Sequence, residues 1–273
     1  MTQLTERRTS IKPIWCPGCG NYGVLSALTK RALPELAIPS HRTFVVSGIG
    51  CSSRMSAYVD AYGLNGIHGR AVAVAQGAKL AKPDLTVIAI GGDGDFFSIG
   101  AGHLPHAVRR NIDITCIMMN NFVYALTKGQ LSPTTPHLRR GEGPFLSHEQ
   151  YPPVDPLLDM VSYSASTGAS FVAQGTSTDV QHLAYLIEEG IRHPGFSFIS
   201  VFTPCLTFDP PELFDIIRSN AIYLTEGELV HLPQSSGSEP WIHDASNIDL
   251  ALRLARVGLL EEPLLGIFFR GKS

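Results

Sequence analysis

Short apolar runs rich in β-branched residues recur along the chain and alternate with stretches whose apolar positions follow a helical spacing. Unbroken apolar runs of this kind are typical of strands that are buried on both faces of a parallel sheet. The runs predict strands at residues 43–47, 85–90, 112–119, 170–173 and 196–201.

The stretches between these runs predict helices at residues 21–33, 70–81, 98–110 and 178–192. One face of the last helix is apolar and consists of Val180, Leu183, Ile187 and Ile191. Ser177 or Thr178 is its expected cap. This alternation predicts an α/β fold, a mostly parallel sheet with helices on both faces.

The pattern weakens after Pro211, where a polar loop at 234–239 and a short helix at 247–256 are the main features. We therefore divide the chain into a main domain, residues 1–210, and a C-terminal arm, residues 211–273. The arm is expected to pack on a partner subunit. Residues 136–156 are expected to form a loop rich in Pro and Gly, which either covers the substrate, contacts a partner, or is a variable surface insertion.

The composition is apolar for a soluble monomer, with 44% hydrophobic and 16% charged residues among 273, which indicates a large partner interface. A net charge of −3 gives no general attraction for nucleic acid. No apolar run is long enough to span a membrane, and residues 1–15 lack the apolar segment of a signal peptide. We therefore expect a cytoplasmic protein whose cysteines do not form disulfides.

Oxygen-bearing side chains follow two of the predicted strands. Asp93 lies between Gly92 and Gly94 after the strand at 85–90, and Asn120 and Asn121 follow the strand at 112–119. The carboxyl ends of parallel strands form the edge at which open α/β sheets bind ligands. Carboxylate and amide oxygens there suit Mg²⁺ bound together with phosphate groups.

The spacing of these two motifs, 25 residues between Gly94 and Asn120, resembles the signature of thiamine diphosphate (TPP) enzymes. The resemblance implies that Asp93, Asn121 and the backbone carbonyl of Val123 hold Mg²⁺.

Four of the five cysteines are candidates for a second metal centre: Cys16, Cys19, Cys51 and Cys205. The first two form a C-x₂-C motif, and the other two directly follow the predicted strands at 43–47 and 196–201, at the same sheet edge as Asp93. Four thiolates suit an iron–sulfur cluster or tetrahedral zinc equally well, and the C-x₂-C pair alone also suits a redox dithiol. Cys116 lies inside a predicted strand and is expected to be a small buried apolar residue.

Five motifs in order give the chain a more specific likeness. They are WCPGCG at 15–20, GIGCSSR at 48–54, HGRA at 68–71, GGDGDFFSIG at 91–100 and NNFVYALTKGQLSPTT at 120–135. With them the chain resembles the β subunit of 2-oxoacid:ferredoxin oxidoreductases over residues 12–135, with Cys205 in addition. The resemblance implies a TPP-binding domain that binds the diphosphate end of the cofactor, and a [4Fe-4S] cluster on Cys16, Cys19, Cys51 and Cys205.

The same resemblance implies the residues that bind the cofactor, which are Ile49, Gly50, Cys51, Ser52, His68, Gly92, Gly94, Asp95, Ala125 and Leu126. Of these, Gly94, Asp95, Ala125 and Leu126 are expected at the diphosphate end. Ala125 stands where the family commonly has glycine, at a cost of about 1 kcal/mol if its φ is positive. His68 and Lys128 are the catalytic candidates, and Lys128, with Thr127, is a candidate for binding the substrate carboxylate.

The resemblance also implies a reaction and partners. A separate α subunit would carry the pyrimidine-binding domain, in an (αβ)2 heterotetramer, and coenzyme A and a 2-oxoacid would react while electrons pass to ferredoxin. We favour 2-oxoglutarate and succinyl-CoA, in either direction, with pyruvate or broad specificity as the alternative. Two further alternatives are a TPP lyase with structural zinc and a non-catalytic iron–sulfur electron-transfer subunit.

Overall fold

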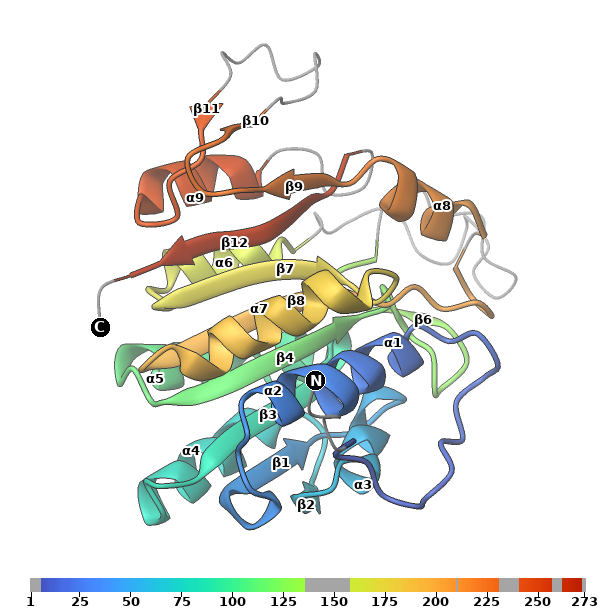
Figure 1. Ribbon diagram of the computed structural model, residues 1–273. Coiled ribbons are helices and arrows are strands. Elements are labelled where there is room, and N and C mark those ends of the chain that lie inside the picture. Colours follow the sequence, from blue (N-terminus) through green and yellow to red (C-terminus); the bar gives the residue numbers. More distant parts are fainter. Residues whose placement is uncertain (1–5, 136–157, 210, 231–240, 257–261, 272–273) are drawn as a thin grey trace, which may run out of the picture.

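The computed structural model describes residues 6–135, 158–209, 211–230, 241–256 and 262–271. Eight strands form one sheet in the order β2-β1-β3-β4-β8-β7-β12-β9 (Figure 1). They are β1 (Thr43–Ser47), β2 (Tyr62–Asn65), β3 (Thr86–Gly92), β4 (Ile114–Asn120), β7 (Phe171–Thr176), β8 (Phe196–Phe202), β9 (Ile222–Leu224) and β12 (Leu264–Arg270). Neighbouring strands are parallel except β7 and β12, which are antiparallel. The predicted α/β fold with a mostly parallel sheet is therefore confirmed.

Helices cover both faces of this sheet, as predicted (Figure 1). One face packs against α1 (Asn21–Ser26), η1 (Ala27–Ala32), α2 (Leu33–Glu35), α3 (Met55–Tyr58) and α7 (Val180–Arg192). The other packs against α4 (Ala71–Ala81), α5 (Leu104–Arg109), α6 (Met160–Ser166) and α9 (Ile248–Ala255). Both faces need a cover because successive side chains of a strand point to opposite faces of the sheet. In β3, Ile88 and Ile90 enter the first core, and Val87 and Ala89 enter the second.

The predicted apolar face of α7 packs on the sheet as expected, with Leu183 and Ile187 fully buried. Its cap differs from the prediction. The carboxylate of Asp179, and neither Ser177 nor Thr178, accepts a hydrogen bond of 3.0 Å from the His182 N–H. Asp179 is one residue nearer the helix than Thr178, so its carboxylate reaches the His182 N–H, which has no acceptor within the helix.

The crossover predicted as one helix at 98–110 is broken into η4 (Asp95–Ile99), η5 (Ala101–His103) and α5. Pro105 has no N–H and favours the first turn of a helix, so the chain restarts there as α5. The segment also begins earlier than predicted, directly after Gly94, which brings Asp95 into the first turn.

The C-terminal arm prediction is wrong in one respect, because β9 and β12 belong to the main sheet. The apolar run of β12 pairs antiparallel with β7, which would otherwise be an edge strand. Packing of 211–273 on a partner remains a prediction. The other elements of this part are α8 (Pro211–Ser219), β10 (Leu229–Val230) and β11 (Trp241–Ile242).

Three smaller elements complete the main domain: η2 (Ser40–Arg42), η3 (Ser52–Arg54) and the hairpin of β5 (Val123–Tyr124) and β6 (Gln130–Leu131). The predicted loops at 136–156 and 234–239 lie outside the described residues. Within the described ranges, no helix is long and apolar enough to cross a lipid bilayer.

Candidate active site

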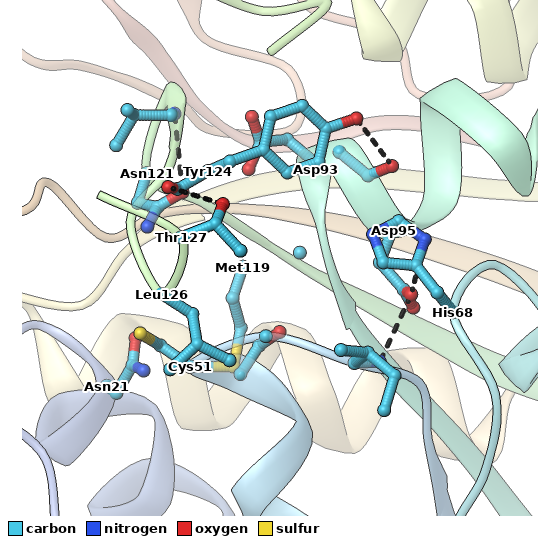
Figure 2. Close-up of a pocket in the computed structure, with 16 residues that line it drawn as sticks. Asn21, Cys51, His68, Asp93, Asp95, Met119, Asn121, Tyr124, Leu126 and Thr127 are labelled. Atoms are coloured by element: carbon cyan, nitrogen blue, oxygen red, sulfur yellow. Dashed lines mark hydrogen bonds and ion pairs between the residues drawn. The ribbon is translucent and has the colours of Figure 1, made fainter. Parts of the chain in front are cut away.

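A pocket opens where the carboxyl ends of β1, β3 and β4 meet (Figure 2). Most of the residues predicted from the sequence to bind the cofactor or Mg²⁺ line it: Ile49, Gly50, Cys51, Ser52, His68, Gly92, Asp93, Gly94, Asp95, Asn121, Val123 and Leu126. The pocket also takes in Asn21, Met119, Tyr124 and Thr127. The sheet edge thus brings together residues as far apart in the sequence as Asn21 and Thr127.

Three oxygen atoms meet at one point of this pocket. The Asn121 side-chain oxygen lies 3.0 Å from Asp93 Oδ1 and 2.7 Å from the Val123 carbonyl oxygen. Oxygens that approach so closely need either a hydrogen or a cation between them. Turning the amide would supply hydrogens, because its nitrogen would then donate to both oxygens. Octahedral Mg²⁺, with ligands at about 2.1 Å, separates neighbouring ligand oxygens by about 3 Å, so the predicted donor set fits this ion.

The backbone conformation at Phe122 directs two of these oxygens toward the same point. Phe122 is a buried residue with a φ of +58°, a left-handed conformation that costs about 1 kcal/mol or more outside glycine. Asn120 Oδ1 accepts a 3.1 Å hydrogen bond from the Phe122 N–H, and the Thr135 hydroxyl donates to the Phe122 carbonyl at 2.6 Å. These contacts hold the reversal between Asn121 and Val123.

Hydroxyl groups support the carboxylate of Asp93, which is 1% exposed. The Thr134 hydroxyl lies 2.7 Å from Asp93 Oδ2 and donates to it, and the Ser132 hydroxyl lies 3.1 Å from that of Thr134. Burial raises the pKa of Asp93, while the hydrogen bonds of Ser132 and Thr134 oppose that shift. Sequence reasoning missed both residues, although their hydroxyls closely follow the Asn pair in the chain.

Tyr124 closes the pocket over the glycine turn. A Cβ on Gly94 would lie 2.2 Å from Tyr124 Cε1, and the Tyr124 hydroxyl donates a long hydrogen bond of 3.4 Å to the Gly94 carbonyl. A side chain at position 94 would therefore force the Tyr124 ring to move. Tyr124 was not predicted as a site residue, and its position in the motif after the Asn pair was the available signal.

Asp95 has contacts that differ from the predicted one with the diphosphate. It is 2% exposed, and its Oδ1 accepts hydrogen bonds from the Gly69 N–H at 2.7 Å and the Ile49 N–H at 3.2 Å. His68 Nδ1 lies 3.5 Å from the same oxygen (Figure 2). Burial raises the pKa of Asp95, opposed by these backbone hydrogen bonds. Contact between Asp95 and the diphosphate remains a prediction, and like charges would oppose it.

The four candidate cysteines line a second cavity of about 270 Å³. They are Cys16, Cys19, Cys51 and Cys205, and the Trp15 indole N–H donates to the Cys51 carbonyl at 2.7 Å. Burial raises the pKa of the Cys19 thiol to about 11; like-charge repulsion from Cys205, Cys51 and Cys16 adds to the rise, and the Asn21 backbone N–H opposes it. Burial likewise raises the pKa of Cys51. Four thiolates so arranged require a compensating positive charge.

The two cavities share a wall. Asn21, Gly50, Cys51, Asn121 and Leu126 line both of them. Asn21 was missed in the sequence because a lone Asn at the start of a helix carries little chemical signal.

Lys128 is the predicted residue that lines neither cavity among the described residues. It is exposed in the turn between β5 and β6, with a φ of +80°. Ala125 lines only the cysteine cavity, and it is not among the residues with positive φ, so replacing glycine there carries no backbone cost. Cys116 is fully buried in β4, as predicted.

Comparisons with known proteins agree with this geometry. The family described as thiamine pyrophosphate enzyme, C-terminal TPP binding domain, matches residues 48–201. The 2-oxoglutarate synthase subunit KorB of Archaeoglobus fulgidus is 41% identical over 217 residues, which cover 78% of this chain and 79% of that protein. The chain belongs to the family of 2-oxoacid:ferredoxin oxidoreductase β subunits.

Two other members of this β-subunit family illustrate the extent of the likeness. The 2-oxoacid:ferredoxin oxidoreductase subunit beta of Sulfolobus sp. is 45% identical over 197 residues, 71% of this chain and 63% of that one. The chain thus spans 63% of the length of this relative. The structure of 2-oxoglutarate:ferredoxin oxidoreductase from Magnetococcus marinus, with 2-oxoglutarate, coenzyme A and succinyl-CoA bound, is 35% identical, with a TM-score of 0.85. The match covers 98% of this β-subunit chain and 84% of that one.

Proposed function

We propose that this chain is the β half of a cytoplasmic (αβ)2 2-oxoacid:ferredoxin oxidoreductase that uses TPP, Mg²⁺ and a [4Fe-4S] cluster. It converts 2-oxoglutarate and coenzyme A into succinyl-CoA, CO₂, a proton and two electrons that ferredoxin accepts, or runs the reverse carboxylation. The observation that carries this proposal is the wall shared by the oxygen-lined pocket and the cysteine cavity. A reaction that releases electrons needs an acceptor beside the site of chemistry.

In the pocket, Asp93, Asn121 and the Val123 carbonyl would hold Mg²⁺ and thereby attract the diphosphate. When bound, TPP supplies the nucleophilic carbon and the electron sink for decarboxylation. His68 lines this pocket and is partly exposed, so its ring can hold or move a proton there. Lys128 and Thr127 are proposed to bind the substrate carboxylate; Thr127 lines the pocket, whereas Lys128 lies on the turn beside it.

The cysteines favour an iron–sulfur cluster over zinc. Among the described residues, no three His, Cys, Asp or Glu side chains are close enough to hold one metal ion. Tetrahedral zinc, with Zn–S bonds of about 2.3 Å, would need sulfurs about 3.8 Å apart. Cys16, Cys19, Cys51 and Cys205 line one cavity of about 270 Å³, which leaves room for a polynuclear cluster that accepts electrons singly.

An incomplete pocket supports the need for an α subunit. In TPP enzymes a glutamate normally contacts the pyrimidine ring, and no glutamate is found in the part of the pocket lining that the structure describes. Two exposed apolar side chains belong to the segments that form the pocket: Leu126, which lines it, is 57% exposed, and Ile67, next to His68 in the sequence, is 75% exposed. A pyrimidine-binding domain on a partner would supply the glutamate and cover these residues.

The names of the relatives bear on the substrate. The Archaeoglobus and Magnetococcus proteins are named for 2-oxoglutarate, which favours that substrate here. The Sulfolobus protein is named only for 2-oxoacids, which keeps a pyruvate-using or broad-specificity enzyme as the second candidate. A non-catalytic electron-transfer subunit would have no use for the three converging oxygens, so we rank it below both.

The test is ferredoxin reduction by the anaerobically purified complex of this chain with its α subunit, compared between 2-oxoglutarate and pyruvate. We expect reduction that requires coenzyme A and is faster with 2-oxoglutarate. Faster reduction with pyruvate would favour the second candidate. A complex that contains TPP and iron but reduces ferredoxin with neither acid would contradict the proposal.

A further inference from the structure

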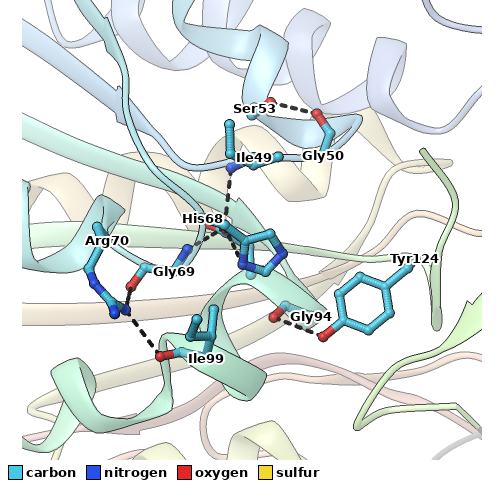
Figure 3. A network of polar contacts seen from close by, with 10 residues as sticks. Ile49, Gly50, Ser53, His68, Gly69, Arg70, Gly94, Ile99 and Tyr124 are labelled. Atoms are coloured by element: carbon cyan, nitrogen blue, oxygen red, sulfur yellow. Dashed lines mark hydrogen bonds and ion pairs between the residues drawn. The ribbon is translucent and has the colours of Figure 1, made fainter. Parts of the chain in front are cut away.

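One buried carboxylate joins three segments of the site that are far apart in the sequence. Oδ1 of Asp95 accepts from the Ile49 N–H, in the loop that also carries Cys51, and from the Gly69 N–H, next to His68. Asp95 itself is two residues beyond Asp93, at the start of η4. A single oxygen therefore holds the loop of Ile49 and Cys51 (the cysteine loop) and the turn of His68 and Gly69 (the His68 turn) against the loop of Asp93, proposed above to bind Mg²⁺ (the Mg²⁺ loop). Figure 3 labels Ile49, His68, Gly69 and Gly94 from these three segments.

This carboxylate packs closely against two glycines. A Cβ on Gly48 would lie 1.9 Å from Asp95 Oδ2, and a Cβ on Gly91 would lie 2.7 Å from it. This second oxygen is buried and has no hydrogen-bond partner among the described residues. The side chain is thus wedged between two backbone segments with Oδ1 directed at the loops.

The His68 turn is equally confined. Gly69 has a φ of +72°, and a Cβ there would lie 2.5 Å from Ile99 Cγ2. The Arg70 guanidinium donates to the carbonyls of both Gly69 and Ile99, each at 3.2 Å. His68 Nδ1 is buried and has no hydrogen bond within the described chain; Asp95 Oδ1, at 3.5 Å, is the carboxylate oxygen paired with it. The imidazole is therefore held with its Nδ1 edge toward Asp95.

We propose that Asp95 is a positioning residue that sets the cysteine loop and the His68 turn relative to the Mg²⁺ loop. The inference rests on the proposed function of the site. It gives Asp95 a role through the backbone, in place of contact with the diphosphate. The oxygen atom at the Oδ1 position performs this role, because both backbone donors point to it.

The test compares Asp95→Ala, which removes the oxygen, with Asp95→Asn, which keeps an amide oxygen and removes the charge. Both are made in the complex with the α subunit. Two quantities are measured without turnover: the dissociation constant of TPP in saturating Mg²⁺, and the EPR spectrum of the dithionite-reduced cluster. Asp159→Ala is the matched control, since Asp159 also accepts two backbone hydrogen bonds, at the start of α6, and lines neither cavity.

We expect Asp95→Ala to weaken TPP binding by about tenfold or more and to change the EPR spectrum, although Asp95 contacts no cysteine directly. Asp95→Asn should restore the wild-type spectrum and a dissociation constant within about threefold of wild type. Asp159→Ala should match wild type in both measurements despite a lower thermal stability. If Asp95→Ala does not assemble with the α subunit, Asp95→Asn is judged alone. A wild-type spectrum and a dissociation constant within about threefold of wild type are then expected, and a larger loss would overturn the inference.

Wild-type values of both quantities for Asp95→Ala would overturn the inference. A loss in Asp95→Asn as large as in Asp95→Ala would also overturn it, because the charge would then act directly on the cofactor or metal. Failure of the proposed function is distinguishable, since the wild-type complex itself would then lack TPP binding or the cluster signal.

Discussion

Replacing Thr134 with valine removes one hydroxyl and keeps the shape of the side chain. Thr134 is 2% exposed, and its hydroxyl donates a 2.7 Å hydrogen bond to the buried Asp93 Oδ2. A hydrogen bond to a charged group contributes about 1.5–3 kcal/mol, and valine leaves Oδ2 without this donor. We therefore expect the free energy of unfolding to fall by about 1.5–3 kcal/mol at neutral pH.

The same change should weaken Mg²⁺ binding. Burial already raises the pKa of Asp93, and loss of the Thr134 donor favours the protonated carboxyl further, which competes with the cation. Removing a group that orients a metal ligand typically costs about 10–100-fold in metal affinity, or about 1.4–2.7 kcal/mol. The strand end of β3 keeps its backbone position, so the effect should be on affinity and not on the number of sites.

The assay is the Mg²⁺ concentration that gives half-maximal TPP binding, followed by fluorescence quenching in the complex with the α subunit. Thr115→Val is the matched control: Thr115 is a buried hydroxyl in β4 that donates to the Gly190 carbonyl at 3.2 Å and lines neither cavity. We expect the control to bind Mg²⁺ like wild type. Equal Mg²⁺ affinities for Thr134→Val and wild type would refute the assigned role of the hydroxyl.

Three other substitutions test separate parts of the account. Gly94→Ala places a Cβ against the Tyr124 ring, so TPP binding should weaken by about tenfold or more in the same titration; wild-type affinity would show that the turn tolerates a side chain. Gly77→Ala, with nothing within 4 Å of the added Cβ and an exposed position inside α4, should raise the free energy of unfolding by about 0.5–1 kcal/mol in urea titrations, and a decrease would contradict this. The pKa of His193 is lowered, chiefly by burial, so on acidification the unfolded chain binds a proton more readily than the folded chain does. The free energy of unfolding should therefore fall as the pH drops from about 7 to about 5. His193→Gln should flatten that fall in denaturation curves taken across the range, and an unchanged slope would exclude His193 as a cause.

The parts of the fold that carry long apolar runs were predictable from the sequence. Strands β1, β3, β4 and β8 are buried on both faces, so their residues are mostly apolar, with a few buried hydroxyl residues such as Thr115 among them. Strand β2 was missed because its four residues are all exposed at the edge and show no such run. Strand β12 has an apolar run, but its place depends on antiparallel pairing with β7, a contact between distant segments that local pattern does not encode.

Some residues of the candidate site were likewise predictable from the sequence, and others were not. The place of Asp93 and Asn121 in the pocket was predictable, because strand ends fix where they lie and because the Mg²⁺ they are proposed to hold prefers such oxygen-bearing side chains. The roles of Thr134 and Asp95 were not predictable. A hydroxyl is common in loops, and the direction of a carboxylate depends on which backbone donors the fold brings to it, here Ile49 and Gly69.

The central claim is that one site combines a TPP pocket with an iron–sulfur cluster. The most direct measurement is the content of iron and acid-labile sulfide in the anaerobically purified complex, together with its EPR spectrum after dithionite reduction. The α subunit is either free of clusters, or the iron and sulfide of its own clusters are subtracted. We predict about four iron and four sulfide per β chain, with the cluster signal lost in Cys205→Ser while TPP binding persists. Zinc in place of iron, or a signal that survives in Cys205→Ser, would contradict the account.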